Sequence, residues 1–238
     1  MKKVKKFKEK RSWWFRGFKA CMKLVIKPPK FVYLGEKIKD GSIILSNHVG
    51  TKAPLAMELY LNQPLRIWGA YQMNGNVFSV YKYQTKTYYI EKKHWNPFLA
   101  YTFCLLASPL TWIFYRGLNL IPTYKDHRFR RTLAESVETI KHNQSVLLFP
   151  EDSTKGYLDE LEGFYAGFVV LAKTLYKQGI DVPIVVSYYK KEAKEYIIDN
   201  PVLYSELLNK YETQEEIAKQ LCERTNELFK INAKSDDK

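Results

Sequence analysis

The sequence predicts one α/β domain whose central sheet is mixed but largely parallel, with helices on both faces. Two observations lead to this fold class. From residue 41 onward, short apolar runs alternate with stretches of helical periodicity, a pattern that favours a layered β/α domain over a helical bundle. The chain has 238 residues, enough for one such domain with a sizeable core and too few for a second large one.

The expected elements follow one another along this part of the chain. Apolar runs predict strands at 42–45, 65–70, 145–149 and 182–187. Helical periodicity predicts helices at 52–60, 128–141 and 164–177. Asn143 suits the left-handed position after the second of these helices. Further on, Thr213 and Glu216 have the spacing of a capping box, which predicts the start of a C-terminal packing helix.

Positive charge is concentrated at the N-terminus. The net charge is +13, and residues 1–30 supply +11 of it, so the remainder of the chain is nearly neutral. Between Phe7 and Val25, apolar residues recur at helical spacing among Lys and Arg, which predicts a basic amphipathic helix suited to an anionic membrane surface. We therefore expect a membrane-binding segment, 1–30, ahead of an α/β domain, 31–238. A docked or disordered basic arm is the alternative.

A second segment raises the question of a membrane. Residues 95–115 contain no charged side chain, although Pro97 and Pro109 weaken the prediction of a span. The alternatives are a true span, an interfacial segment, and a buried core or the wall of a substrate tunnel.

The cysteines and the N-terminus indicate a cytosolic location. The three cysteines are far apart and lack metal-ligand spacing, which favours reduced thiols and predicts no metal site. Lys and Arg interrupt the first segment throughout, so it does not resemble a secretory signal. We expect the protein at the cytosolic face of the cell membrane, peripheral or monotopic.

Two polar turns carry the residues most suited to chemistry. Asn47 and His48 lie between the expected strand 42–45 and a helix, and a neutral histidine there can accept a proton near pH 7. An isolated histidine is more often structural. The second turn, 150–155, follows the strand at 145–149, and loops at the carboxyl ends of such strands bind ligands. By itself, this turn is equally consistent with an ordinary helix cap.

Five short blocks, taken in order between residues 42 and 187, resemble the lysophospholipid and glycerol-3-phosphate acyltransferase family. The blocks are Asn47-His48 with Pro54, which resembles NHxSxxDP; 117–122, which resembles the second family block; 149–151, which begins FPEGTRS; Phe164, Gly167, Leu171 and Ala172, which match F-x-x-G-x-x-x-L-A; and 182–185, which resembles the last block. Each block is common, and their order makes the resemblance specific.

The resemblance implies an acyltransferase that moves an acyl group from acyl-CoA or acyl-carrier protein to the hydroxyl of a lysophospholipid such as lysophosphatidic acid. His48 would deprotonate the hydroxyl, with the carboxylates Glu151 and Asp152 in the same site. The residues expected to bind the acceptor are Asn47, Gly117, Pro150, Ser153, Thr154, Lys155 and Lys125. No cofactor is implied, because the thioester already carries the activated acyl group.

At two positions the sequence lacks the arginine that the family blocks carry, and this arginine would be expected to bind phosphate. Thr154 stands where the third block has Arg, so Lys155 is the nearest cation there. Thr123 stands where the second block has Arg, and Lys125 is its candidate substitute.

A larger departure concerns the residue that should support His48. Ala53 stands where the family has the Asp that orients the histidine and stabilises its protonated form. In a serine-protease triad, losing the corresponding carboxylate costs about ten-thousand-fold in turnover. The candidates to replace it are Asp152, Glu151 and Glu58; Lys52 or a backbone carbonyl could also orient the ring. A weak enzyme or a non-catalytic relative would equally account for Ala53.

Two other classes of function compete with the enzyme. Ala53 favours a catalytically impaired, lipid-binding or regulatory protein at the membrane surface, whereas retention of His48 and Glu151 favours the enzyme. The net charge alone would suit a nucleic-acid partner. We regard nucleic acid as unlikely, because the charge lies in one terminal segment and not across the domain.

Overall fold

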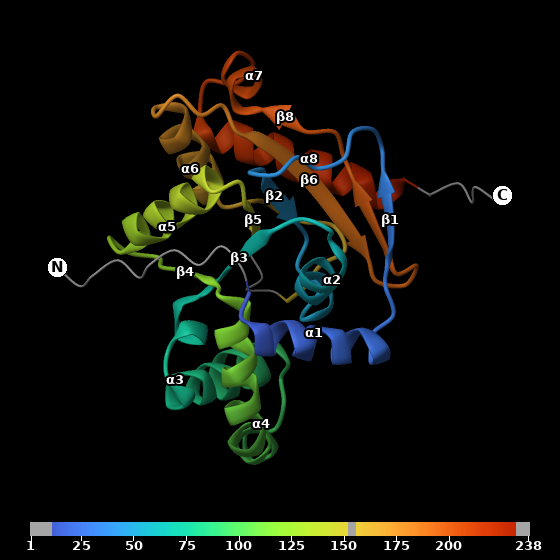
Figure 1. Cartoon of the computed structure of the whole chain (residues 1–238), viewed down its shortest axis with the longest axis vertical. Helices are drawn as coiled ribbons and strands as arrows, with labels where there is room; N and C mark the ends of the chain where they lie inside the picture. Colours follow the sequence, from blue (N-terminus) through green and yellow to red (C-terminus); the bar gives the residue numbers. More distant parts are fainter. Residues whose placement is uncertain (1–10, 152–155, 232–238) are drawn as a thin grey trace.

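The protein is an α/β domain, and its computed structural model describes residues 11–151 and 156–231 (Figure 1). Within the described residues, eight strands form one sheet in the order β1-β7-β6-β2-β5-β3-β4, and β8 pairs with β6. The strands are β1 Lys30–Tyr33, β2 Ile43–Ser46, β3 Leu65–Ala70, β4 Ile121–Thr123, β5 Ser145–Leu148, β6 Pro183–Lys190, β7 Glu195–Ile198 and β8 Val202–Leu203.

The sheet is mixed and mostly parallel, as predicted. The pairs β1·β7, β2·β5, β2·β6, β3·β4 and β3·β5 are parallel, whereas β7 and β8 each run antiparallel to β6. Strand β2 lies in the interior of the sheet, between β6 and β5. The carboxyl ends of β2, β5, β3 and β4 therefore meet at one edge, where a parallel sheet offers a ligand site.

Helices cover the two faces of the sheet and extend beyond one end of it (Figure 1). They are α1 Trp13–Val25, α2 Lys52–Tyr60, α3 Val77–Lys82, α4 Pro97–Leu118, α5 Phe129–Lys141, α6 Gly167–Tyr176, α7 Tyr204–Leu208 and α8 Gln214–Lys230, with a 3-10 helix, η1 Tyr71–Asn74, and a π-helix, η2 Tyr83–Lys92.

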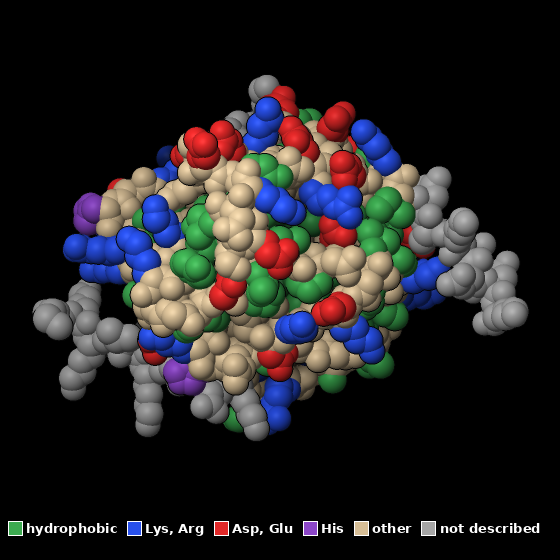
Figure 2. Space-filling view, turned by 90° about the horizontal axis from the view of Figure 1, so that it is seen from above, with side chains coloured by type: hydrophobic (Ala, Val, Ile, Leu, Met, Phe, Trp, Pro, Cys, Tyr) green, Lys and Arg blue, Asp and Glu red, His purple; other side chains and the backbone are tan. Residues whose placement is uncertain are grey.

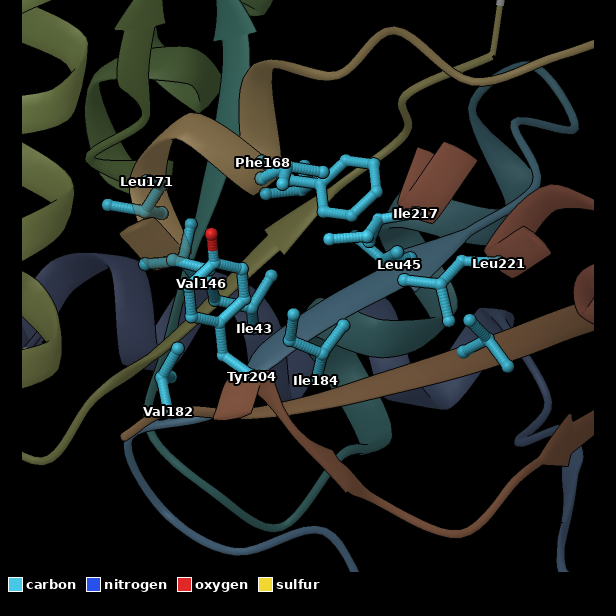
Figure 3. Close-up of a cluster of buried hydrophobic side chains, with 14 of the residues drawn as sticks. Ile43, Leu45, Val146, Phe168, Leu171, Val182, Ile184, Tyr204, Ile217 and Leu221 are labelled. Carbon is cyan, nitrogen blue, oxygen red and sulfur yellow. The ribbon is translucent and has the colours of Figure 1, made fainter. Parts of the chain in front are cut away.

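Alternation along the central strands divides the core in two. Ile43 and Leu45 of β2 point to one face of the sheet, and Ile44 points to the other, because successive strand residues face opposite sides. The first face packs against residues of α5, α6 and α8 (Figure 3). The second packs against α1 and α2. Apolar residues on both faces explain why these strands read as continuous apolar runs.

Most predicted elements are present, with small shifts at their ends. The helix expected at 164–177 begins at Gly167, and the strand expected at 182–187 continues to Lys190. Asn143 has the left-handed backbone conformation predicted for it, with φ of 53°. Thr213 and Glu216 form the predicted capping box at the start of α8. Strands β1, β4, β7 and β8, helix α7 and the segment from η1 to η2 were not predicted.

The amphipathic helix expected between Phe7 and Val25 begins at Trp13 within the described part of the chain, and residues 1–10 lie outside that part. The structure does not support a helix that offers its whole apolar side to a membrane. Phe15 is fully buried, and its ring lies 5.8 Å from that of Phe114 in α4. For α1, the docked alternative is the better description.

The uncharged segment 95–115 lies, from Pro97 onward, in the single helix α4, which continues through Pro109. Most of its large apolar side chains are exposed, which counts against the prediction of a buried core or tunnel wall. Among the described helices, α4 alone is long and apolar enough to cross a membrane. Length and composition alone do not place it in one.

Candidate active site

His48 and Glu151 follow adjacent parallel strands at the same edge of the sheet. Leu45 of β2 pairs with Leu148 of β5, and each candidate residue lies three positions beyond its paired leucine. Because neighbouring strands are about 4.8 Å apart, this register brings the two loops together. The sheet thus places the predicted base beside one of the predicted carboxylates.

Asn47 anchors the turn that carries His48. Its side-chain amide donates a hydrogen bond to the carbonyl of Tyr189 at 3.2 Å, and its oxygen accepts one from the backbone amide of Tyr189 at 2.7 Å. Asn47 is buried, so these bonds satisfy polar groups that water does not reach. This side chain ties the end of β2 to β6 and thereby holds His48 in place, a structural role beside the acceptor binding predicted for it.

Aromatic rings surround the imidazole of His48. The ring of Tyr157 stacks on it with a centroid distance of 4.8 Å, and the ring of Phe149 meets it edge-on at 4.9 Å. Burial lowers the pKa of His48 to about 4, and the positive charge of Lys92 acts in the same direction. His48 is therefore neutral at pH 7 and able to accept a proton.

One nitrogen of this ring lacks a hydrogen-bond partner in the part of the chain that the structure describes. The Nδ1 atom of His48 is buried and has no hydrogen-bond partner among the described residues. Buried ring nitrogens normally have a partner, which in a catalytic histidine also sets the tautomer.

Glu151 is a second buried polar group at this edge. Its side chain is 8% exposed, and neither carboxylate oxygen makes a well-formed hydrogen bond to another described residue. Burial raises the pKa of Glu151 to about 7, while the nearby backbone amide of His48 and the Lys92 cation oppose that rise. A carboxyl group poised near pH 7 can exchange a proton readily, as acid–base catalysis requires.

Of the carboxylates expected from the sequence to support His48, Glu58 is engaged elsewhere. Its oxygens are held by Arg11 at 2.6 Å and by Lys19 at 3.0 Å, beneath α1. Ala53 itself is fully buried in the first turn of α2, where its backbone carbonyl accepts a hydrogen bond from the hydroxyl of Tyr196 at 2.8 Å. Glu58 thus connects α1 and the nearby Arg11 to α2. Of the candidate carboxylates that the structure describes, Glu151 is the one beside His48.

Two cations next to the site, Lys92 and Lys93, were not predicted. The ammonium of Lys92 lies 5.6 Å from the ring centroid of Tyr157, and that of Lys93 lies 5.9 Å from it on the same ring. Tyr157 is the ring that stacks on His48. The π-helix η2 brings the two lysines here from a distant part of the sequence, so the pair gives no signal as a motif, apart from the general association of π-helices with functional sites.

Other predicted binding residues fall into two groups. The backbone of Pro150 accepts a hydrogen bond from Tyr165 at 2.8 Å, and the ammonium of Lys125 lies 5.9 Å from the ring centroid of Tyr165. Lys125 therefore lies near the segment that pairs with Pro150, and its role in binding the acceptor stays a prediction. Gly117 instead lies in the last turn of α4 and packs against the ring of Phe15.

The remaining predicted site residues are Asp152, Ser153, Thr154 and Lys155, which lie outside the described residues. Within the described part of the chain, no group of three or more His, Cys, Asp or Glu side chains could hold a metal ion. A cavity of about 400 Å³ opens between α1 and α2, and its lining includes neither His48 nor Glu151. The candidate site is therefore defined by its side chains and not by that cavity.

The geometry defines an α/β protein with a neutral histidine and a raised-pKa carboxyl group at the carboxyl edge of a largely parallel sheet. No family model matches this chain, and no curated protein matches its sequence.

Proposed function

We propose that the protein is an acyltransferase that moves an acyl group from a thioester to the hydroxyl of a lysophospholipid, giving phosphatidic acid when the acceptor is lysophosphatidic acid. The observation that carries this proposal is the neutral His48 beside Glu151, at the register set by β2 and β5. The order of the five sequence blocks supports the same reaction class. Acyl-CoA or acyl-carrier protein is the co-substrate.

In the proposed reaction, His48 takes the proton of the acceptor hydroxyl as its oxygen attacks the thioester carbonyl. The carbon–sulfur bond then breaks, and the imidazolium returns the proton to the departing thiolate. The products are an ester and a free thiol. An ionised Glu151 would stabilise the transient positive charge on His48, which is the function that Ala53 lacks.

Phosphate on the acceptor needs a cation, and Lys92 and Lys93 are our first candidates. They lie over the ring that stacks on His48, so a headgroup bound there would keep its hydroxyl near the base. Lys125, whose ammonium lies 5.9 Å from the ring centroid of Tyr165, is the second candidate.

The acceptor is an amphiphile that partitions into lipid bilayers, so the enzyme would act at a membrane surface, and we propose the cytosolic face of the cell membrane. The anionic surface there would attract the basic residues of segment 1–30.

The proposal is tested by measuring acyl transfer from acyl-CoA to lysophosphatidic acid on anionic vesicles. His48→Ala is expected to lose at least a hundredfold in turnover, the scale of general-base catalysis. His142→Ala is the control, because His142 is exposed at the end of α5, where its ring lies 2.8 Å from the carbonyl oxygen of Glu138. Equal activity of parent and His48→Ala would refute the proposed role of His48.

A second function is favoured by Ala53. In this alternative the protein keeps the fold, binds lipid at the membrane surface and regulates another process without catalysis. Ala53→Asp distinguishes the two: an inert parent with an active Ala53→Asp variant would identify a disabled enzyme. The fully buried position of Ala53 makes a stability measurement on that variant necessary.

A further inference from the structure

Helix α4 carries a large apolar surface that no described part of the protein covers. Phe98 is 81% exposed, and Leu106 is 79% exposed. We define the α4 surface as Phe98, Leu99, Phe103, Leu105, Leu106 and Leu110, all exposed. Contiguous apolar patches of this kind on a protein surface mark sites of interaction with another molecule or a membrane.

The opposite side of α4 is bound firmly to the protein. Ala100, Cys104 and Ser108 are buried at four-residue spacing, which places them on one side of the helix. Ser108 donates a hydrogen bond to Gln84 of η2 at 3.0 Å, and the indole of Trp112 donates one to the carbonyl of Gly75 at 3.0 Å. Helix α4 is therefore held on one side and bare on the other, an arrangement that does not suit a helix surrounded by lipid.

The charge around this surface favours an anionic partner. Residues 77–118, which run from α3 to the end of α4, contain five basic side chains and one acidic side chain, Glu91. Lys82, Lys86 and Lys93 are all exposed. At the other end of the molecule, acidic and basic side chains are interspersed around α7 and α8 (Figure 2). An apolar surface flanked by lysines, with aromatic rings such as Trp95 beside it, matches the acyl and headgroup layers of an anionic bilayer.

The α4 surface also adjoins the candidate active site. The ring centroid of Phe103 lies 5.3 Å from that of Tyr89 in η2, and the ring centroid of Tyr88 lies 4.9 Å from that of Tyr89. Lys93 lies over the rings of both Tyr88 and Tyr157, and Tyr157 stacks on His48. A continuous series of contacts thus connects the apolar surface with the imidazole.

From these observations we infer that the α4 surface inserts into one leaflet of an anionic phospholipid bilayer and is the principal membrane-binding surface of the protein. Helix α1, whose Phe15 is buried against α4, has a supporting role. In this orientation Lys92 and Lys93 lie at the headgroup layer, and a lipid can present its headgroup to His48 without leaving the membrane. The binding itself does not depend on acyl transfer.

The inference is tested by sedimentation with vesicles of phosphatidylglycerol and phosphatidylcholine, without acyl donor. The double variant Leu105→Asp/Leu106→Asp is expected to lose at least tenfold in partitioning, because two charges would enter the acyl layer. The matched control is Leu203→Asp/Leu208→Asp, two exposed leucines near α7 at the opposite end, which is expected to bind like the parent (Figure 1). Thermal unfolding checks that both variants fold.

His48→Ala separates this inference from the proposed activity. It is expected to bind vesicles like the parent, whether or not the parent transfers acyl groups. Normal binding by Leu105→Asp/Leu106→Asp would overturn the inference. So would sedimentation equilibrium showing that the parent is a dimer that this variant dissociates, because a second copy would then cover the surface.

A fluorescent label reports which surface enters the lipid. In a Cys21→Ser background, which removes the exposed cysteine, an environment-sensitive label at Leu106→Cys is expected to shift to shorter wavelength on anionic vesicles. The same label at Leu208→Cys is expected to stay in water. Vesicle binding with no shift at position 106 would assign insertion to another surface, such as segment 1–30, and overturn the inference.

Discussion

At the scale of single residues, burial shifts His48 and Glu151 in opposite directions. Removing water disfavours the charged form of each group, so the pKa of the histidine falls to about 4 and that of the glutamate rises to about 7. Both side chains are therefore uncharged over part of the neutral range. Burial alone can therefore keep an uncharged base beside an uncharged carboxyl group at this site.

Glu151 is expected to destabilise the protein at high pH. Its folded-state pKa lies above the ordinary value of 4.5, so its stabilising effect is complete below pH 4.5 and is lost as the pH rises through 7. At pH 8.5, Glu151→Gln is expected to raise the free energy of unfolding by up to about 3 kcal/mol, the scale of such a pKa shift. Urea unfolding at pH 4.5 and 8.5 measures this. An equal effect at both values would contradict the assigned pKa.

Lys93 is expected to recognise the phosphate of the acceptor. Lys93→Ala should raise KM for lysophosphatidic acid about tenfold or more, because a hydrogen bond to a charged group contributes about 1.5–3 kcal/mol. The KM for an acceptor with a free hydroxyl and no phosphate should not change. Lys125→Ala is the comparison, since Lys125 lies beside Tyr165 and is the other candidate for the phosphate. A larger effect in Lys125→Ala would transfer the phosphate site to that residue.

At the scale of elements, the contact between α1 and α4 depends on a glycine. A Cβ atom on Gly117 would approach the ring of Phe15 to 2.0 Å, whereas one on Gly17 would meet nothing within 4 Å. The resemblance to the acyltransferase blocks places Gly117 in acceptor binding. Gly117 instead makes room for the ring of Phe15. No local sequence pattern shows this, because the two residues are far apart in the sequence.

Two glycine substitutions are expected to have opposite effects on stability. Gly117→Ala should lower the free energy of unfolding by about 1–3 kcal/mol, the usual cost of overpacking. Gly17→Ala should raise it by up to about 1 kcal/mol, because alanine favours a helix interior. Denaturant unfolding of both variants measures the difference. If Gly117→Ala keeps full stability, α1 does not depend on this contact.

At the scale of the whole molecule, α1 belongs to the domain and is not a detachable arm. Phe15 lies in the same core cluster as Ile44 and Leu147 of the central strands. Arg11 and Lys19 neutralise the buried carboxylate of Glu58. Loss of α1 would expose that apolar surface and leave Glu58 charged and without its two cations.

Two truncations test this integration. Deletion of residues 1–26 is expected to lower the free energy of unfolding by at least about 3 kcal/mol, the scale of losing one buried phenylalanine. Deletion of residues 1–10 keeps Arg11 and Phe15 and should change it by less than about 1 kcal/mol, the range of surface changes. Equilibrium unfolding in urea compares the two. Equal stability of both truncated proteins would restore the separate membrane-binding segment 1–30 predicted from the sequence.

The sequence by itself determined the α/β class, the central strands β2, β5 and β6, and the positions of His48 and Glu151, because apolar runs, helical periodicity and strand-end loops are local patterns. Only the tertiary structure decided three further features. They are the ion pairs of Glu58 with Arg11 and Lys19, the position of Lys92 and Lys93 beside Tyr157, and the exposed apolar surface of α4. Each depends on which distant segments pack together, and hydrophobic burial sets that packing without leaving a signal in the local sequence.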